Sequence, residues 1–191
     1  MREFGDLVEF AAAAGERLGE SSWHEVTQHQ VDLFAGATGD RQWIHVDPAR
    51  AADGPFGGTI AHGYLMLSLI PRLLEEIYRV DRVGVVVNTS VDELRFVSVV
   101  PVGASVRLVA ELASVQPRAR GAIEVGIAAT VEIRDRAKPA CTARIGFIMR
   151  PAPPADAASR AASPADAASR PASSTDVVSV TVSAVSGVRE A

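Results

Sequence analysis

The chain has 191 residues, of which 48% are hydrophobic and 22% are charged, as expected for one ordinary globular domain with a core of its own. The formal net charge of −4 excludes a general attraction to nucleic acid, and the single cysteine, Cys141, excludes an internal disulfide and a cysteine-based metal cluster. Acidic residues interrupt the N-terminal apolar run and no uncharged run is long enough to span a bilayer, so we expect a cytoplasmic protein with neither nucleic-acid nor membrane partners.

The N-terminal segment predicts a short helix followed by an extended stretch. Asp6 and Glu9 have the spacing of a capping box, and the apolar face that follows is ended by Gly15. Residues 21–26 can then be extended. The first helix therefore precedes a segment that could join a sheet.

A second helix is expected from Thr27 to about Thr38. Thr27 and Gln30 repeat the capping-box spacing, and Gly39 stands where a left-handed residue commonly ends a helix. The side chain of Asp40 therefore leaves directly from a helix end.

Residues 40–58 show no sustained hydrophobic period. They contain the turn-forming pairs Asp47-Pro48, Gly54-Pro55 and Gly57-Gly58. Long loops inside compact domains are usually functional. We therefore expect an irregular loop that carries part of a site.

Residues 61–69 are apolar on nearly every side, and the first charged residue after them is Arg72. This pattern predicts a helix surrounded by protein, with a bend near Pro71. After residue 80 the pattern changes to the two-residue period of strands, which we expect at 83–91, 94–100, 106–112, 123–133 and 141–149. One buried helix followed by antiparallel strands predicts an α+β fold in which a curved sheet wraps that helix.

The last part of the chain differs in composition. The sequence Pro-Ala-Asp-Ala-Ala-Ser-Arg occurs at 154–160 and again at 164–170. Such low-complexity sequence without aromatic residues predicts disorder. We therefore expect one domain over residues 1–150 and a tail over 151–191 without a functional role.

The predicted loop and the start of the buried helix hold the candidate catalytic groups. Asp40 and His45 are five positions apart and could hold one water molecule and move its protons, or could be a turn cap and a surface imidazole. The backbone N–H of Gly63, after His62, could bind a carbonyl oxygen that gains negative charge, or Gly63 could serve close packing alone. Ser68 could contact a ligand or bond its own helix.

A metal site is the main competing interpretation. Asp40, His45 and His62, or His45 with Asp47, offer suitable ligand types. No two histidines have the helical i, i+4 spacing, so we expect no metal. The sequence also contains no nucleophile elbow, phosphate loop or dinucleotide fingerprint.

The stretch from Gly39 to His45, followed by Ile60-Ala61-His62-Gly63 and the helical segment YLMLSL, resembles the MaoC-like, (R)-specific enoyl-CoA hydratases of the hot-dog fold. The family motif reads Gly-Asp-x-Asn-Pro, an apolar residue, and His. The likeness covers residues 1 to about 150 and is greatest to the single-domain 3-hydroxyacyl-thioester dehydratases. Gln42 replaces the usual asparagine and Trp43 the usual proline.

The resemblance implies (R)-specific hydration of trans-2-enoyl thioesters, or the reverse dehydration. It implies that Asp40 and His45 are the catalytic pair, that the amide of Gly63 forms the oxyanion hole, and that substrate-binding residues also include Gln42, His62 and Ser68. An acyl-CoA thioesterase and a non-catalytic acyl-thioester-binding subunit remain alternatives.

The likeness also implies a homodimer, and no cofactor beyond the coenzyme A or carrier protein that is part of the substrate. The candidates for binding the coenzyme A phosphates are Arg41, Arg72 and Arg95. The residues that either line an acyl tunnel or belong to the core are Tyr64, Leu65, Leu67 and Leu69.

Overall fold

The computed structural model describes residues 1–153, so the segment predicted as a tail lies outside the described residues apart from 151–153. The helices are α1 (Leu7–Ala12), α2 (Gln28–Thr38), α3 (Trp43–Val46), α4 (Pro48–Ala52) and α5 (Gly63–Ile77). The strands are β1 (Arg2–Phe4), β2 (Arg17–Glu20), β3 (His24–Glu25), β4 (Tyr78–Val80), β5 (Val83–Phe96), β6 (Ser105–Pro117), β7 (Ile123–Ile133) and β8 (Cys141–Pro151).

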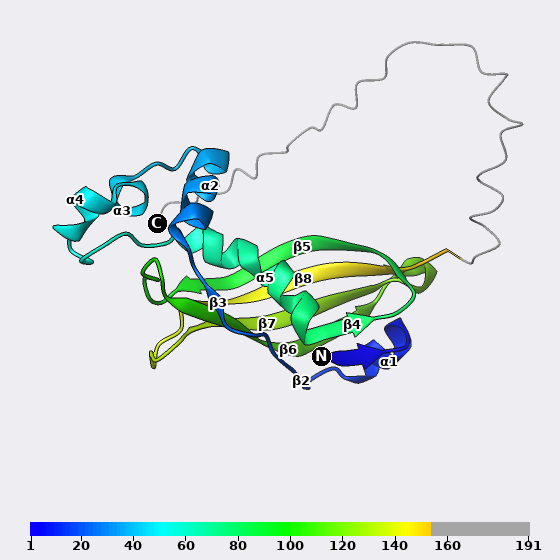
Figure 1. Cartoon of the computed structure of the whole chain (residues 1–191). Coiled ribbons are helices and arrows are strands. Elements are labelled where there is room, and N and C mark those ends of the chain that lie inside the picture. Colours follow the sequence, from blue (N-terminus) through cyan, green and yellow to red (C-terminus); the bar gives the residue numbers. More distant parts are fainter. Residues whose placement is uncertain (154–191) are drawn as a thin grey trace, which may run out of the picture. The chain divides into compact units, whose positions relative to one another are not determined.

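An antiparallel sheet with the strand order β2-β6-β7-β8-β5 forms the main layer, and β3 also pairs with β6. Helix α5 lies across one face of this sheet (Figure 1). Strands β1 and β4 form a separate parallel pair. The predicted α+β arrangement, with one central helix against a sheet, is therefore confirmed.

The core lies between α5 and the sheet. In β7 the residues of one face, among them Ile127 and Val131, are buried, while the alternate residues are partly exposed. Ile70 and Leu73 of α5 belong to the same hydrophobic cluster. The exposed side of α5 carries Tyr64, which is 64% exposed, so the expectation that protein surrounds this helix on all sides is wrong for the described chain.

The predicted helix caps are confirmed at two places. The Asp6 carboxylate accepts hydrogen bonds from the amides of Val8 and Glu9 at the start of α1. Thr27 and Gln30 form the reciprocal capping box of α2, and Gly39 ends that helix with φ of +80°. Local sequence therefore places Asp40 at a defined helix end.

Three segment predictions are corrected. The loop expected over 40–58 contains α3 and α4, because Asp47 caps α4 and Pro48 is its first residue. The two strands expected over 83–100 are one strand, β5, which ends at Phe96 and has irregular pairing near Asp92. The extended stretch expected over 21–26 contributes only the short β3, whereas β2 forms earlier.

Strand β5 is an edge of the sheet, because its pairing within residues 1–153 is with β8 alone. Several of its valines are about half exposed: Val85, Val86, Val87 and Val91.

No helix in this part of the chain has the length and apolar character needed to cross a membrane.

Candidate active site

His45 lies on α3 and is only 7% exposed. Its ring nitrogen Nδ1 is 2.7 Å from the carbonyl oxygen of Ile60. Because a carbonyl oxygen can only accept, Nδ1 carries the proton of this hydrogen bond. In the neutral imidazole, Nε2 then holds the lone pair and is free to accept a proton.

His62, the N-cap residue of α5, lies behind His45 and is 2% exposed. The two imidazole rings stack with their centroids 3.8 Å apart and an interplanar angle of 25°. The Nε2 of His62 donates to the backbone oxygen of Asp40 at 2.9 Å. This bond ties the end of α2 to the beginning of α5.

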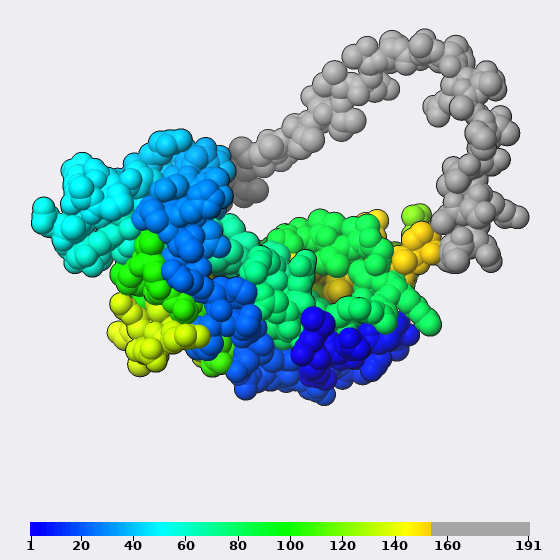
Figure 2. Space-filling view, viewed as in Figure 1, coloured from blue at the N-terminus to red at the C-terminus, as the bar shows by residue number. Residues whose placement is uncertain are grey.

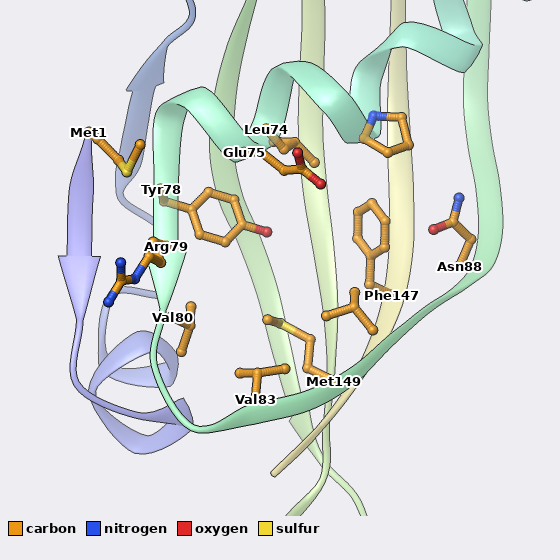
Figure 3. A pocket seen from close by; sticks show the side chains of 12 residues that line it. Met1, Leu74, Glu75, Tyr78, Arg79, Val80, Val83, Asn88, Phe147 and Met149 are labelled. Atoms are coloured by element: carbon orange, nitrogen blue, oxygen red, sulfur yellow. The ribbon is translucent and has the colours of Figure 1, made fainter. Parts of the chain in front are cut away.

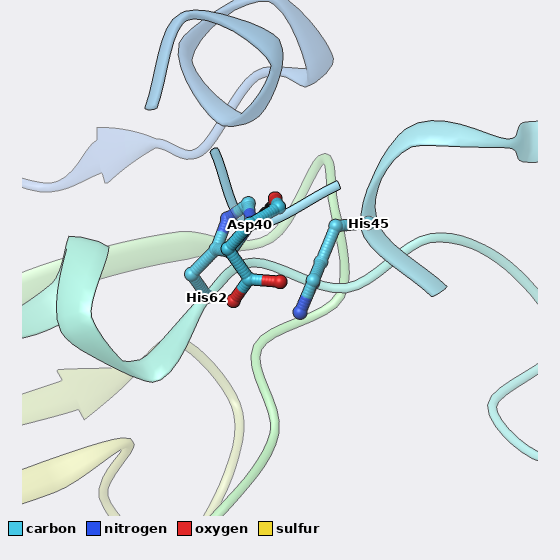
Figure 4. Close-up of side chains that lie close together, drawn as sticks. All are labelled: Asp40, His45 and His62. Atoms are coloured by element: carbon cyan, nitrogen blue, oxygen red, sulfur yellow. Dashed lines mark hydrogen bonds between the residues drawn. The ribbon is translucent and has the colours of Figure 1, made fainter. Parts of the chain in front are cut away.

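Asp40, His45 and His62 come together although they belong to different elements (Figure 4). One potential ligand atom from each of the three lies within 4.8 Å of the others, and the Asp40 carboxylate is exposed. Such a set could hold a metal ion. One nitrogen of each ring already bonds a backbone carbonyl oxygen, His45 to Ile60 and His62 to Asp40, so one nitrogen of each ring is left for proton transfer or for a metal ion.

A cavity of about 350 Å³ adjoins this group. His45 and Gly63 both line it, together with Phe96 and mainly apolar residues. Gly63 is the first residue of α5, so its N–H has no partner within the helix and lies at the positive end of the helix dipole. The imidazole of His45 and the residue at the N-terminal end of α5 therefore border the same cavity.

Asp40 and His62 lie beside His45 but are not among the residues that line the cavity, and Gln42 and Ser68 lie apart from the lining as well. Gln42 is exposed, and its backbone N–H approaches Asp40 Oδ1 at 3.5 Å. The Ser68 hydroxyl donates to the backbone oxygen of Tyr64 at 2.7 Å. Of the two possibilities for Ser68, contact with a ligand or a hydrogen bond to its own helix, the structure shows the second. Trp43, which replaces the usual proline, lies under the Arg50 guanidinium and beside Gly54, where it fixes the loop.

Sequence reasoning missed Phe96 and Gln28. The ring of Phe96 lies against Gly63, where an added Cβ would be only 3.0 Å from it. Gln28 bonds the backbone of His45 from α2. Neither residue lies in a motif, so the sequence offered no signal for its position.

The family described as MaoC like domain matches residues 9–133. The chain is 49% identical over 143 residues to 3-hydroxyacyl-thioester dehydratase Z of Mycobacterium tuberculosis, covering 75% of this chain and 95% of the relative. It is 40% identical over 139 residues to Nodulation protein N of Rhizobium leguminosarum, covering 72% and 86%.

Among solved structures, the (R)-hydratase PhaJ1 of Pseudomonas aeruginosa superposes with a TM-score of 0.60 at 25% identity, covering 73% of this chain and 83% of that one. The (R)-hydratase of A. caviae, at 22% identity, has the same fold with a TM-score of 0.57, covering 73% and 96%. The match over 9–133 and the 49% identity to the dehydratase establish the family that the motif around Asp40 and His45 predicted. The chain belongs to the MaoC-like family of hot-dog proteins.

Proposed function

We propose that the protein is an (R)-specific hydratase and dehydratase that interconverts trans-2-enoyl and (R)-3-hydroxyacyl thioesters. The observation that carries this proposal is the meeting of Asp40 and His45 beside a cavity that also presents the amide of Gly63. The names of the dehydratase relative and of the (R)-hydratase neighbour support it.

In the proposed hydration, the oxygen of water bonds to the β-carbon while the α-carbon gains a proton. Asp40 and His45 hold the water and exchange these protons, with Nε2 as the active atom of the imidazole. Negative charge that builds on the thioester oxygen is stabilised by the Gly63 N–H and the dipole of α5. Dehydration follows the same path in reverse.

The direct test follows loss of the conjugated-thioester absorbance when the purified protein is mixed with an enoyl-CoA, and then determines the configuration of the product. We expect an (R)-3-hydroxyacyl-CoA. Release of free coenzyme A thiol without a hydrated product would assign a thioesterase. Binding of enoyl-CoA with no turnover would assign a non-catalytic subunit.

A second cavity of about 500 Å³ is proposed to take the far end of the acyl chain. It lies beside the C-terminal half of α5 and is lined mainly by apolar residues, including Leu74, Val86 and Phe147 (Figure 3). In Figure 2 the molecule is hollowed between α5 and β5. Burial raises the pKa of Tyr78 in this lining to about 12, so its phenol stays uncharged, as suits an apolar chain.

Val86→Trp is expected to lower kcat/KM for dodecenoyl-CoA by about tenfold or more and to leave the value for crotonyl-CoA unchanged. Val86 lines the second cavity, and the helix rises about 12 Å between Gly63 and Pro71, so only a long chain reaches it. Val85→Trp is a matched control, because Val85 is 51% exposed and Val86 is 50% exposed. Adjacent residues of a strand face opposite sides, so the side chain at position 85 points away from the cavity. Equal effects of both changes on both substrates would contradict this assignment.

We further propose a cytoplasmic homodimer joined through β5. The half-exposed valines of this edge strand would pair with the same strand of a second copy. Two structural neighbours, HadBC and ChsH1-ChsH2 of M. tuberculosis, are complexes of two different subunits, so pairing with a different chain is the alternative to the homodimer. Light scattering is expected to give twice the chain mass, and a monomer mass at all concentrations would refute the dimer.

Exposed arginines are proposed to bind the phosphates of coenzyme A. Arg41 follows Asp40, and Arg95 precedes Phe96 at the cavity, whereas Arg72 lies farther along α5 and faces Glu76 at 3.6 Å. We therefore favour Arg41 and Arg95 over Arg72 for this contact.

A further inference from the structure

The side chain of Gln28 joins two segments that together hold His45. Its Nε2 donates to the backbone oxygen of His45 at 2.7 Å, and its Oε1 accepts from the Thr59 hydroxyl at 2.6 Å. Nε2 also lies 2.8 Å from Asp32 Oδ1. One amide therefore links the start of α2, the end of α3 and the segment before α5.

These two segments are also the ones that fix the imidazole. Ile60, next to Thr59, accepts the proton of His45 Nδ1 through its carbonyl oxygen, and its N–H donates to Ile44 O at 3.0 Å. Displacement of Thr59 from Gln28 would therefore move the acceptor that sets the tautomer of His45. Thr59 and His45 are buried, and the hydrogen bond between His45 and Ile60 is buried, while the two bonds of Gln28 are partly buried.

Capping of α2 does not explain the contacts of Gln28. Thr27 and Gln30 already form the complete capping box of this helix. Gln28, the first residue of α2, instead directs its amide to segments that are 17 and 31 positions away in the chain. One of its contacts, with Asp32, stays within α2, and the other two serve the arrangement around His45.

We propose that Gln28 is a positioning residue for the reaction, acting through the backbone of His45 and through Thr59 to hold the imidazole with Nε2 facing the cavity. This inference rests on the proposed function. Both of its inter-segment hydrogen bonds go to groups that hold His45, so Gln28 acts through these groups rather than on the substrate itself. In many active sites a carboxylate or amide orients a catalytic imidazole by a hydrogen bond to the ring nitrogen that does not face the substrate. Gln28 instead bonds the backbone oxygen of the histidine.

The test replaces Gln28 with methionine, which keeps the length of the side chain and removes its hydrogen bonds. We expect kcat to fall about 10-fold to 100-fold while KM stays within about threefold, because small displacements of a catalytic group have effects of this size. The pH profile of kcat should change as well. Thr59→Val should reproduce the defect, and Thr59→Ser, which retains the hydroxyl, should restore the rate.

Gln30→Met is the matched control. Gln30 lies on the same turn of α2 and its replacement removes a capping hydrogen bond, but the groups that Gln28 uses to contact His45 and Thr59 are unchanged. Both methionine variants should lower the melting temperature, and only Gln28→Met should change kcat and the pH profile. A Gln28→Met or Thr59→Val protein that is less stable yet has wild-type kcat and pH profile would overturn the proposal.

A readout independent of turnover separates this proposal from the proposed function. Nitrogen chemical shifts of isotopically labelled histidine report which ring nitrogen carries the proton. His45 is expected to be protonated at Nδ1 in the wild type and to be a mixture of tautomers in Gln28→Met. An unchanged tautomer would refute positioning by Gln28, even if no thioester substrate were found.

Discussion

Asp40→Asn and His45→Asn are each expected to lower kcat/KM with an enoyl-CoA by about 10²-fold to 10⁴-fold, the usual contribution of a positioned acid or base. Asparagine at position 40 keeps the shape of the side chain but cannot take up the proton. At position 45 its amide nitrogen can still donate to Ile60 O, as Nδ1 does, while the proton-exchanging Nε2 is lost. Steady-state kinetics on the three proteins measure the effect.

Two exposed residues outside the cavity lining provide matched controls for this pair. Asp53→Asn changes a carboxylate in the same loop region, and His29→Gln changes an imidazole on α2. Both should retain wild-type kinetics. Undiminished rates in Asp40→Asn and His45→Asn would remove this pair from the mechanism. The likeness to the family would then explain only the fold.

Local chemistry explains which parts of the fold could be predicted from the sequence. The caps at Asp6 and Thr27 and the left-handed Gly39 depend on residues within a few positions of one another. The alternation in β7 likewise depends on a single strand. These features are fixed by neighbours in the chain, so sequence patterns were sufficient to find them.

The errors occur where packing between distant segments decides the structure. Asp92-Glu93 looked like a break between two strands, but β5 accommodates the pair with irregular pairing and a positive φ of 53° at Glu93. An edge strand tolerates such an irregularity because its other side is unpaired. The pair Asp47-Pro48 predicts a turn, but an N-cap residue followed by proline also begins a helix, as it does at the start of α4.

The candidate site shows the same division. The family motif implies that Asp40, His45 and Gly63 belong to one site, and the structure places a ligand atom of Asp40 within 4.8 Å of one of His45, while His45 and Gly63 line one cavity. The stacking of His62 on His45 could not be predicted, since it requires the start of α5 to return to α3. The same limit applies to Gln28, whose partner Thr59 is 31 positions away.

Gly63→Pro is expected to lower kcat/KM by about 10²-fold to 10³-fold, the usual cost of losing one oxyanion donor. Proline removes the N–H of this residue, and position 63 is the first residue of α5, where helices accept proline without losing an internal hydrogen bond. His62 already has φ of −61° and ψ of 138°, which suits a residue that precedes proline. The loss should therefore appear in the rate, with little change in melting temperature.

Gly63→Ala separates the amide from the steric effect of a larger residue. Alanine keeps the N–H and adds a Cβ that meets the Phe96 ring at 3.0 Å, and the ring can move aside because it is 47% exposed. We expect less than about a tenfold loss for this variant, so the difference between proline and alanine reflects the lost N–H together with the ring carbon that replaces its hydrogen. Equal kinetics for the two variants would show that charge on the thioester oxygen is stabilised elsewhere, and the start of α5 would then be only a wall of the cavity.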